Sequence, residues 1–238
     1  NVDGKILKAD TQKLLQEMMA TYMDVDMEAM SNMSGMGNMG GMSSMGSMGM
    51  MSTGLWQELL PGTDGAPIND LLVNQYDVVY GSWPNSYDEI VLVVDENNEL
   101  DDVTLYALGL LPEEEMDLLA DAALNGTKLE HKEMKWSYED ICNMEYKAIL
   151  NADCYAYEES TGLYADLRDT EAGLRYLYDN ALTLKVTGII KPSEDSDTRM
   201  ISGNLCYTDD LTKYLIEKAE DSKVIEAQLA DTETDVLT

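Results

Sequence analysis

The chain has 238 residues, 45% of them hydrophobic, and a formal net charge of −31 at pH 7. This length allows one large domain or two small ones, and the apolar fraction is enough for a packed core. Such an acidic surface repels nucleic acid and anionic lipid headgroups, and no basic patch offsets it, so we expect no nucleic-acid partner.

The ends and the cysteines set two further expectations. No apolar run approaches the roughly 18 residues of a membrane-spanning helix, and no signal peptide is visible. Because residue 1 is Asn and not Met, we expect the chain to be a piece of a longer protein. The cysteines, at positions 142, 154 and 206, have no zinc-site spacing. They allow one disulfide, although isolated buried thiols are favoured.

The first fifty residues change character midway. Val2–Leu7 predicts a short strand, and Asp10 or Thr11 predicts the N-cap of a helix with apolar residues at helical spacing. A methionine then occupies every third position: Met27, Met30, Met33, Met36, Met39, Met42, Met45 and Met48.

This methionine repeat does not predict a helix. A period of three does not match the helical period of about 3.6, and its Gly and Ser spacers destabilise helices. We interpret residues 31–60 as a Met/Gly/Ser-rich flexible segment. Two alternatives stay open: an adaptable apolar surface for a peptide or membrane, and a Cu(I) site of thioethers. The candidate ligands of that metal site are Met33, Met36, Met39, Met42 and Met45.

The next elements are short and bounded by turn residues. Trp56–Leu60 predicts a turn of helix, and Pro61–Gly65 predicts a loop. Asn69 predicts the N-cap of a helix over Asp70–Gln75, and the alternation in Tyr76–Tyr80 predicts a strand.

The most apolar run of the chain is Ile90–Val94. A β-branched run of this length between turn residues predicts a strand that is buried on both faces. Asp95–Asn98 predicts the turn that ends it, and Asp101 or Asp102 predicts the N-cap of a helix reaching Leu110.

The second half contains further elements of both kinds. We expect a helix after Pro112 that stops at Asn125-Gly126, then a helical turn from Ser137 to Cys142 and strands over Met144–Leu150 and Tyr155–Tyr157. A turn at Glu158–Gly162 and irregular structure over Asp169–Asn180 precede a strong strand over Leu182–Ile190. The last predicted elements are an extended piece over Ile201–Cys206 and helices over Thr208–Ala219 and Ser222–Ala230. Helices and strands alternate, but several connections resemble hairpins, which predicts an α+β fold with a mixed sheet.

No catalytic constellation emerges from the residues. The acidic run from Asp95 has Leu100 and Tyr106 where a calcium loop needs glycine and glutamate, so it predicts a turn. The single histidine, His131, lies in a charged stretch that is typical of solvated surface. A pair such as Asp101-Asp102 is more often solvated surface than part of a glycosidase dyad. We therefore expect neither an enzyme nor a cofactor.

Residues 80–102, YGSWPNSYDEIVLVVDENNELDD, resemble the extracytoplasmic domain of FtsX-like (MacB-like) ABC-transporter permeases of Gram-positive anaerobic bacteria. Their pattern is a strand, a glycine turn, a proline loop, a D-E-I-V-L strand and an acidic-capped helix. Trp136–Asp140, Leu184–Pro192 and Ser202–Thr208 fit the same pattern, and the tail Ala227–Thr238 is more weakly similar. The methionine repeat belongs to no pattern of this family.

The resemblance implies a MacB-like periplasmic-core fold: a mixed sheet with helices packed on it and a small inserted subdomain. We expect residues 1–30, 75–111 and 181–238 to form the core and 112–180 the insertion. The implied domain lies between two membrane helices, outside the cell membrane.

The function implied is non-catalytic. Such a domain couples ATP-driven helix motion to export, sensing or partner binding. The implied partners are a cytoplasmic ATP-binding subunit or domain, a second permease copy, and a peptide or protein outside the membrane. For the last, we expect a binding loop that contains Trp83, Pro84 and Tyr87.

Two other functions remain as alternatives. One is a secreted binding protein that uses the methionine-rich segment for Cu(I) or an apolar peptide. The other is a hydrolase with a carboxylate dyad, which requires two carboxylates at glycosidase spacing in a deep cleft.

Overall fold

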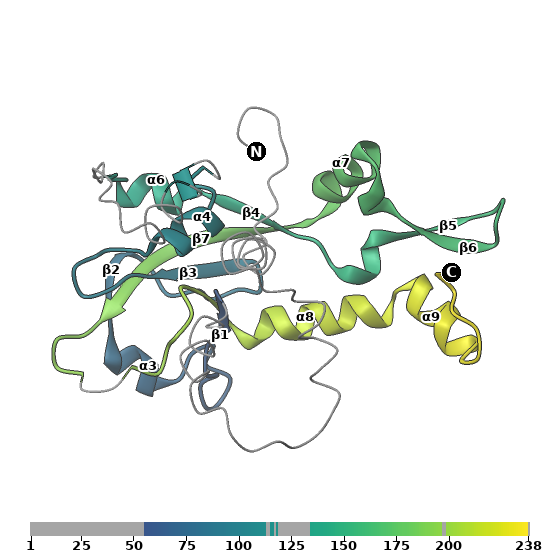
Figure 1. Ribbon diagram of the computed structural model, residues 1–238. Coiled ribbons are helices and arrows are strands. Elements are labelled where there is room, and N and C mark those ends of the chain that lie inside the picture. Colours follow the sequence, from purple (N-terminus) through teal and green to yellow (C-terminus); the bar gives the residue numbers. More distant parts are fainter. Residues whose placement is uncertain (1–54, 113–114, 117, 119–133, 197–198, 238) are drawn as a thin grey trace, which may run out of the picture. The chain divides into compact units, whose positions relative to one another are not determined.

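The computed structural model describes residues 55–112, 115–116, 118, 134–196 and 199–237 (Figure 1). Most of these residues, 56–98 and those from 136 onward, belong to one compact unit, and residues 99–135 belong to a second unit. The predicted strand and helix before residue 30, the methionine repeat, His131 and most of the helix predicted after Pro112 lie outside the described residues.

The described elements confirm an α+β fold with parallel and antiparallel strands in one sheet. The strands are β1 (Trp56–Glu58), β2 (Tyr76–Gly81), β3 (Glu89–Val93), β4 (Glu145–Ala148), β5 (Tyr155–Glu158), β6 (Leu163–Asp166), β7 (Leu182–Pro192) and β8 (Leu205–Tyr207). The α-helices are α3 (Asp70–Gln75), α4 (Asp102–Ala107), α6 (Tyr138–Cys142), α7 (Glu171–Asn180), α8 (Asp209–Glu220) and α9 (Lys223–Ala230), and η3 (Asn151–Cys154) and η4 (Leu167–Asp169) are 3-10 helices.

The sheet of the larger unit has the strand order β1-β8-β3-β7-β2, with β4 pairing to β7 beyond this path. β3 lies parallel to β7 and antiparallel to β8, whereas β2 and β4 are antiparallel to β7. The long strand β7 therefore pairs with β4 along its first half and with β2 and β3 along its second half. β5 and β6 form a separate two-stranded hairpin.

The central strand β3 is buried on both of its faces, as its apolar run predicts. Ile90 and Val91 have no exposed surface, and Leu92 retains 1%. Because successive side chains point to opposite faces, Val91 and Val93 belong to one core cluster. They share it with Leu59, Ile68, Leu72, Tyr76, Ile190, Ile201 and Cys206. This cluster joins α3, four strands and the segment before β8 into one packed body.

A glycine pair allows the backbones of β2 and β7 to approach closely. Gly81 lies opposite Gly188 in this antiparallel pair, one residue after the position in β7 where its register with β3 shifts, at Thr187. Gly81 has a φ of +70°, a conformation that favours glycine. A Cβ on Gly188 would overlap the backbone of Ser82. The close approach of the two backbones therefore requires glycine at both positions.

Four local sequence signals are confirmed in the structure. The Asn69 side chain accepts a hydrogen bond from the Leu71 amide at 3.1 Å and caps α3. Asp101, not Asp102, caps α4, and Ser137 caps α6. The turn after β3 is built on Asp95, whose side chain accepts a hydrogen bond from the Asn97 amide at 2.9 Å.

Three predicted elements are wrong or too long. Residues 56–58 form a strand instead of a turn of helix, because they pair in parallel with β8, nearly 150 positions away in the chain. The segment predicted as irregular, Asp169–Asn180, contains the ten-residue helix α7. The helix after Asp101 ends at Ala107 instead of Leu110, because Gly109 adopts a φ of +72° and closes a left-handed C-cap.

Cys142, Cys154 and Cys206 are thiols that form no disulfide, as the isolated-thiol interpretation predicts: Cys154 and Cys206 are buried and Cys142 is half-buried. Burial raises the pKa of the Cys206 thiol to about 12, because the thiolate would lose its hydration. None of the helices in the described residues has the length and apolar character that crossing a bilayer requires.

A tyrosine-lined candidate functional site

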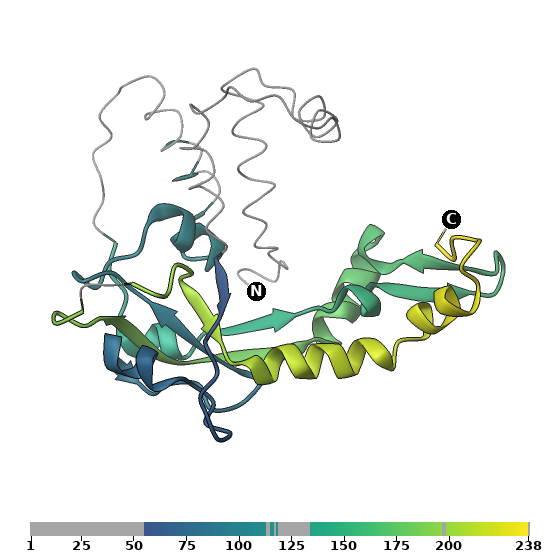
Figure 2. The same ribbon diagram turned by 90° about the horizontal axis from the view of Figure 1, so that it is seen from below.

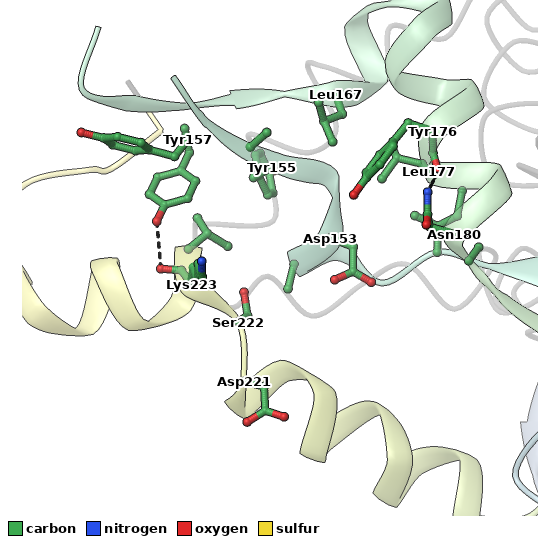
Figure 3. A pocket seen from close by; sticks show the side chains of 16 residues that line it. Asp153, Tyr155, Tyr157, Leu167, Tyr176, Leu177, Asn180, Asp221, Ser222 and Lys223 are labelled. Atoms are coloured by element: carbon green, nitrogen blue, oxygen red, sulfur yellow. Dashed lines mark hydrogen bonds between the residues drawn. The ribbon is translucent and has the colours of Figure 1, made fainter. Parts of the chain in front are cut away.

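A pocket of about 650 Å³ lies at one end of the larger unit (Figure 3). The strands β4 and β7 lead from the sheet to this end (Figure 1). We call it the tyrosine pocket. Its walls come from η3, the β5–β6 hairpin, α7 and the junction between α8 and α9. The lining residues are Ile149, Ala152, Asp153, Tyr155, Ala156, Tyr157, Tyr164, Leu167, Tyr176, Leu177, Asn180, Ala181, Asp221, Ser222, Lys223 and Val224.

The hairpin wall is held by two contacts of Tyr164. Its hydroxyl donates a hydrogen bond to the Lys223 carbonyl oxygen at 3.1 Å, and its amide donates to the Val236 carbonyl oxygen at 3.0 Å. Tyr157 lies directly across the hairpin and meets the Tyr164 ring edge-on, with 5.4 Å between centroids. An isolated two-stranded hairpin is marginally stable, so these ties to α9 and to the C-terminal segment fix the wall. Figure 2 shows α8 leading from β8 to α9 beside the hairpin.

The second wall is α7, which begins at a local cap. The Thr170 hydroxyl accepts a hydrogen bond from the Gly173 amide at 3.0 Å. A Cβ at Gly173 would overlap the Leu167 carbonyl oxygen, so glycine allows α7 to lie close against η4. Leu177 is buried beneath the helix, and Tyr176 is 60% exposed and lines the pocket. The cap thus places an exposed aromatic ring at the pocket.

Beside the pocket, the guanidinium of Arg168 already has hydrogen-bond partners within the protein. Arg168 donates from Nε to Asp166 Oδ1 at 2.9 Å and from a terminal nitrogen to the Tyr155 hydroxyl at 3.1 Å. The guanidinium also lies over the Tyr155 ring, 5.5 Å from its centroid. This hydrogen-bonded pair lowers the pKa of the Asp166 carboxyl and raises the pKa of Arg168. Arg168 therefore fixes Tyr155 and remains paired with Asp166.

Three other charged side chains line the pocket. Asp153 comes from η3, whereas Asp221 and Lys223 flank Ser222 at the α8–α9 junction (Figure 3). All three are exposed to solvent. Within the described part of the chain, neither carboxylate has a side-chain hydrogen bond or an ion pair. The lining therefore carries two carboxylates against one ammonium group, which favours a positively charged guest.

The predicted partner loop is not part of this pocket. Trp83 packs against the core cluster around Tyr76, and Pro84 is fully buried. Tyr87 is 39% exposed, and its ring stacks on Tyr214 of α8 with 4.5 Å between centroids. Of the three residues predicted to bind a partner, Tyr87 is thus the one that is exposed. The candidate Cu(I) ligands from Met33 to Met45 lie outside the described residues.

The chemistry of the pocket is that of binding. Tyrosine rings supply apolar contact and a polar tip, and the carboxylates and the Asn180 amide can orient a ligand. No group of three or more His, Cys, Asp or Glu side chains in the described ranges is arranged to hold a metal ion. Comparisons with protein-family models, curated proteins and solved structures find no match.

The sequence contained a partial signal for this site. Thr170 is a good N-cap residue, and Leu174, Leu177 and Tyr178 recur at helical spacing, so α7 could have been recognised. The pocket itself had no such signal, because its lining combines residues 149–181 with residues 221–224, about forty positions further along the chain.

Proposed function

We propose that this chain is the non-catalytic extracytoplasmic domain of an FtsX-like (MacB-like) ABC-transporter permease. In this role it binds a partner outside the membrane and couples that binding to ATP-driven motion of the membrane helices. Its partners are then a cytoplasmic ATP-binding subunit or domain and a second permease copy.

One observation carries the proposal. The three strand-forming blocks that resemble the family come together as neighbouring strands. Residues 80–102 contain β3, Leu184–Pro192 lies within β7, and Ser202–Thr208 contains β8. In the sheet these strands are adjacent, in the order β8-β3-β7. Blocks that are separated by up to about a hundred positions in the chain thus form one continuous centre, as expected when a pattern reflects a shared core.

The arrangement also suits mechanical coupling. β7 is a single strand of eleven residues. It is paired with β4 near the tyrosine pocket and with β2 and β3 in the main sheet. Because one backbone segment runs from the pocket end into the sheet, a displacement at the pocket end can be passed to the sheet through β7. A binding event at one end of this unit can therefore bias the orientation of the whole body.

The test is made on the native protein in its own cells. Antibodies raised against this chain should detect it in membranes after an alkaline wash, and in intact cells it should be cleaved by protease added outside. Immunoprecipitation from detergent-solubilised membranes should recover an ATPase with a P-loop. Recovery of the chain from the culture medium or the cytosol, without an ATPase, would refute the proposal. A variant lacking residues 31–51, tested for Cu(I) binding against the intact chain, would address the alternative of a secreted metal binder.

A further inference from the structure

The tyrosine pocket has the dimensions of a small-molecule site. Its volume of about 650 Å³ falls within the range of roughly 300–1,000 Å³ that is typical of ligand pockets in proteins. Buried Leu177 and Val224 form part of its floor, and tyrosine rings provide much of the remaining wall. A ligand with an apolar body can therefore gain contact area on several sides.

Tyrosine rings in this chain take cations as partners where cations are available. Among the described residues, three tyrosine rings lie within 6 Å of a cationic group: Tyr155 with Arg168 at 5.5 Å, Tyr178 with Lys147 at 5.8 Å and Tyr214 with Lys218 at 5.7 Å. The negative face of the ring attracts the cation. The chain has only 15 Lys and Arg residues against 46 Asp and Glu residues, so cations are scarce.

Two exposed aromatic rings at the pocket lack such a partner. Tyr157 and Tyr176 are 58% and 60% exposed, and no cation of the described chain lies over either ring. Figure 3 shows Tyr155 and Tyr176 on the hairpin and α7 side of the pocket and Asp221, Ser222 and Lys223 on the opposite side. A ligand in the pocket thus lies between aromatic rings and a charged segment.

The charges at the pocket favour a ligand with a positive charge. Asp153 and Asp221 reach it from different walls, and neither is neutralised by a described side chain. Lys223 supplies one opposing charge, and the guanidinium of Arg168, which contacts the lining residue Tyr155, is held by Asp166. The strongly acidic surface outside the pocket adds attraction for a cation and repulsion for an anion.

We propose that the tyrosine pocket binds a small organic cation, that is, a molecule with a protonated amine or a quaternary ammonium group on an apolar body. The apolar body packs against the tyrosine rings, Leu177 and Val224, and the ammonium group lies near Asp153 or Asp221. This inference rests on the pocket alone and holds or fails independently of the membrane location proposed above.

Three probes that share one alkyl chain separate charge from size. Hexylamine, hexan-1-ol and hexanoate are each titrated into the full-length chain and followed by chemical-shift changes in NMR spectra. The ionic strength is kept near about 0.15 M, where longer-range attraction between exposed charges is largely screened. We expect hexylamine to bind about tenfold more tightly than hexan-1-ol, and hexanoate to bind most weakly. Equal binding of amine and alcohol, or tightest binding of hexanoate, would overturn the proposal.

Variants then locate the site. Tyr176→Ala removes an exposed ring from a helix that tolerates alanine, so it should fold and weaken hexylamine binding by about threefold to tenfold. Tyr176→Phe keeps the ring and should bind as the parent does. A loss in both variants, or in neither, contradicts the role of the ring, and circular dichroism checks that each is folded.

The carboxylates are tested against a distant control. Asp153→Asn and Asp221→Asn should together weaken hexylamine binding by about tenfold. Asp77→Asn removes an equally exposed charge from β2, away from the pocket lining, and should leave binding unchanged. An equal loss with Asp77→Asn would show general attraction to an acidic surface, and the proposal would be wrong.

Discussion

The buried hydroxyl of Tyr76 links the start of β2 to the segment before β8. The Ile201 amide donates a hydrogen bond to this oxygen at 3.0 Å, and the two side chains retain 3% and 7% of their exposed surface. Tyr76→Phe keeps the ring in the core but leaves the Ile201 amide without its acceptor. An unsatisfied buried donor costs about 1–3 kcal/mol. We therefore expect the free energy of unfolding to fall by about that amount.

Urea denaturation followed by circular dichroism measures this change. With a denaturant slope of roughly 2 kcal/mol per molar for a chain of this size, the midpoint should fall by roughly 0.5–1.5 M. The matched control is Tyr80→Phe on the same strand. Tyr80 is 41% exposed, and its hydroxyl has no hydrogen bond with a described residue. The free energy of unfolding of Tyr80→Phe should therefore stay within about 0.5 kcal/mol of that of the parent protein. Equal midpoints for the two variants would refute the reasoning.

Three further predictions concern the same unit. Gln57 Oε1 accepts hydrogen bonds from the amides at 202 and 203, at 2.7 and 2.9 Å. In urea denaturation, Gln57→Leu should therefore lower the free energy of unfolding by about 1–2 kcal/mol, and Gln57→Glu should lower it by less because it keeps an acceptor oxygen; equal losses would contradict this role. Gly188→Ala should lower the free energy of unfolding by about 1–3 kcal/mol in the same assay, because its Cβ would overlap the Ser82 backbone; an unchanged midpoint would argue against this close approach. The pKa of Cys206 is raised from 9.0 to about 12 in the folded protein. This thiol should therefore leave stability unchanged below about pH 9 and reduce it by up to about 1.4 kcal/mol per pH unit above that. The pH dependence of unfolding in Cys206→Ala should be shallower, and an identical slope would refute this assignment.

Some elements were predictable because their causes are local. The side chains of Asn69, Asp101 and Ser137 cap helices through hydrogen bonds to amides two or three positions away. The apolar run of β3 required burial on both faces wherever the strand was placed. Such features depend on neighbours in the chain and on the exclusion of apolar side chains from water.

The site was less predictable, because contacts between distant segments decide whether each of its side chains is buried or exposed. The partner-binding role expected for Trp83 and Pro84 rested on their place in a loop between strands. In the structure both turn inward, and the core uses them as apolar surface. Conversely, Tyr157 and Tyr176 had no distinguishing local pattern, and only the meeting of the hairpin and α7 makes them neighbours of one pocket.

The sequence by itself determined the α+β class, the two principal strands β3 and β7, the acidic surface and most helix starts. Tertiary structure decided that Trp56–Glu58 is a strand, because a three-residue segment becomes a strand only through its pairing with β8. It also decided the strand order and the tyrosine pocket, whose lining comes from residues 149–157, 164–181 and 221–224. Periodicity and capping are encoded over a few neighbouring residues, whereas pairing and cavities depend on contacts between distant segments.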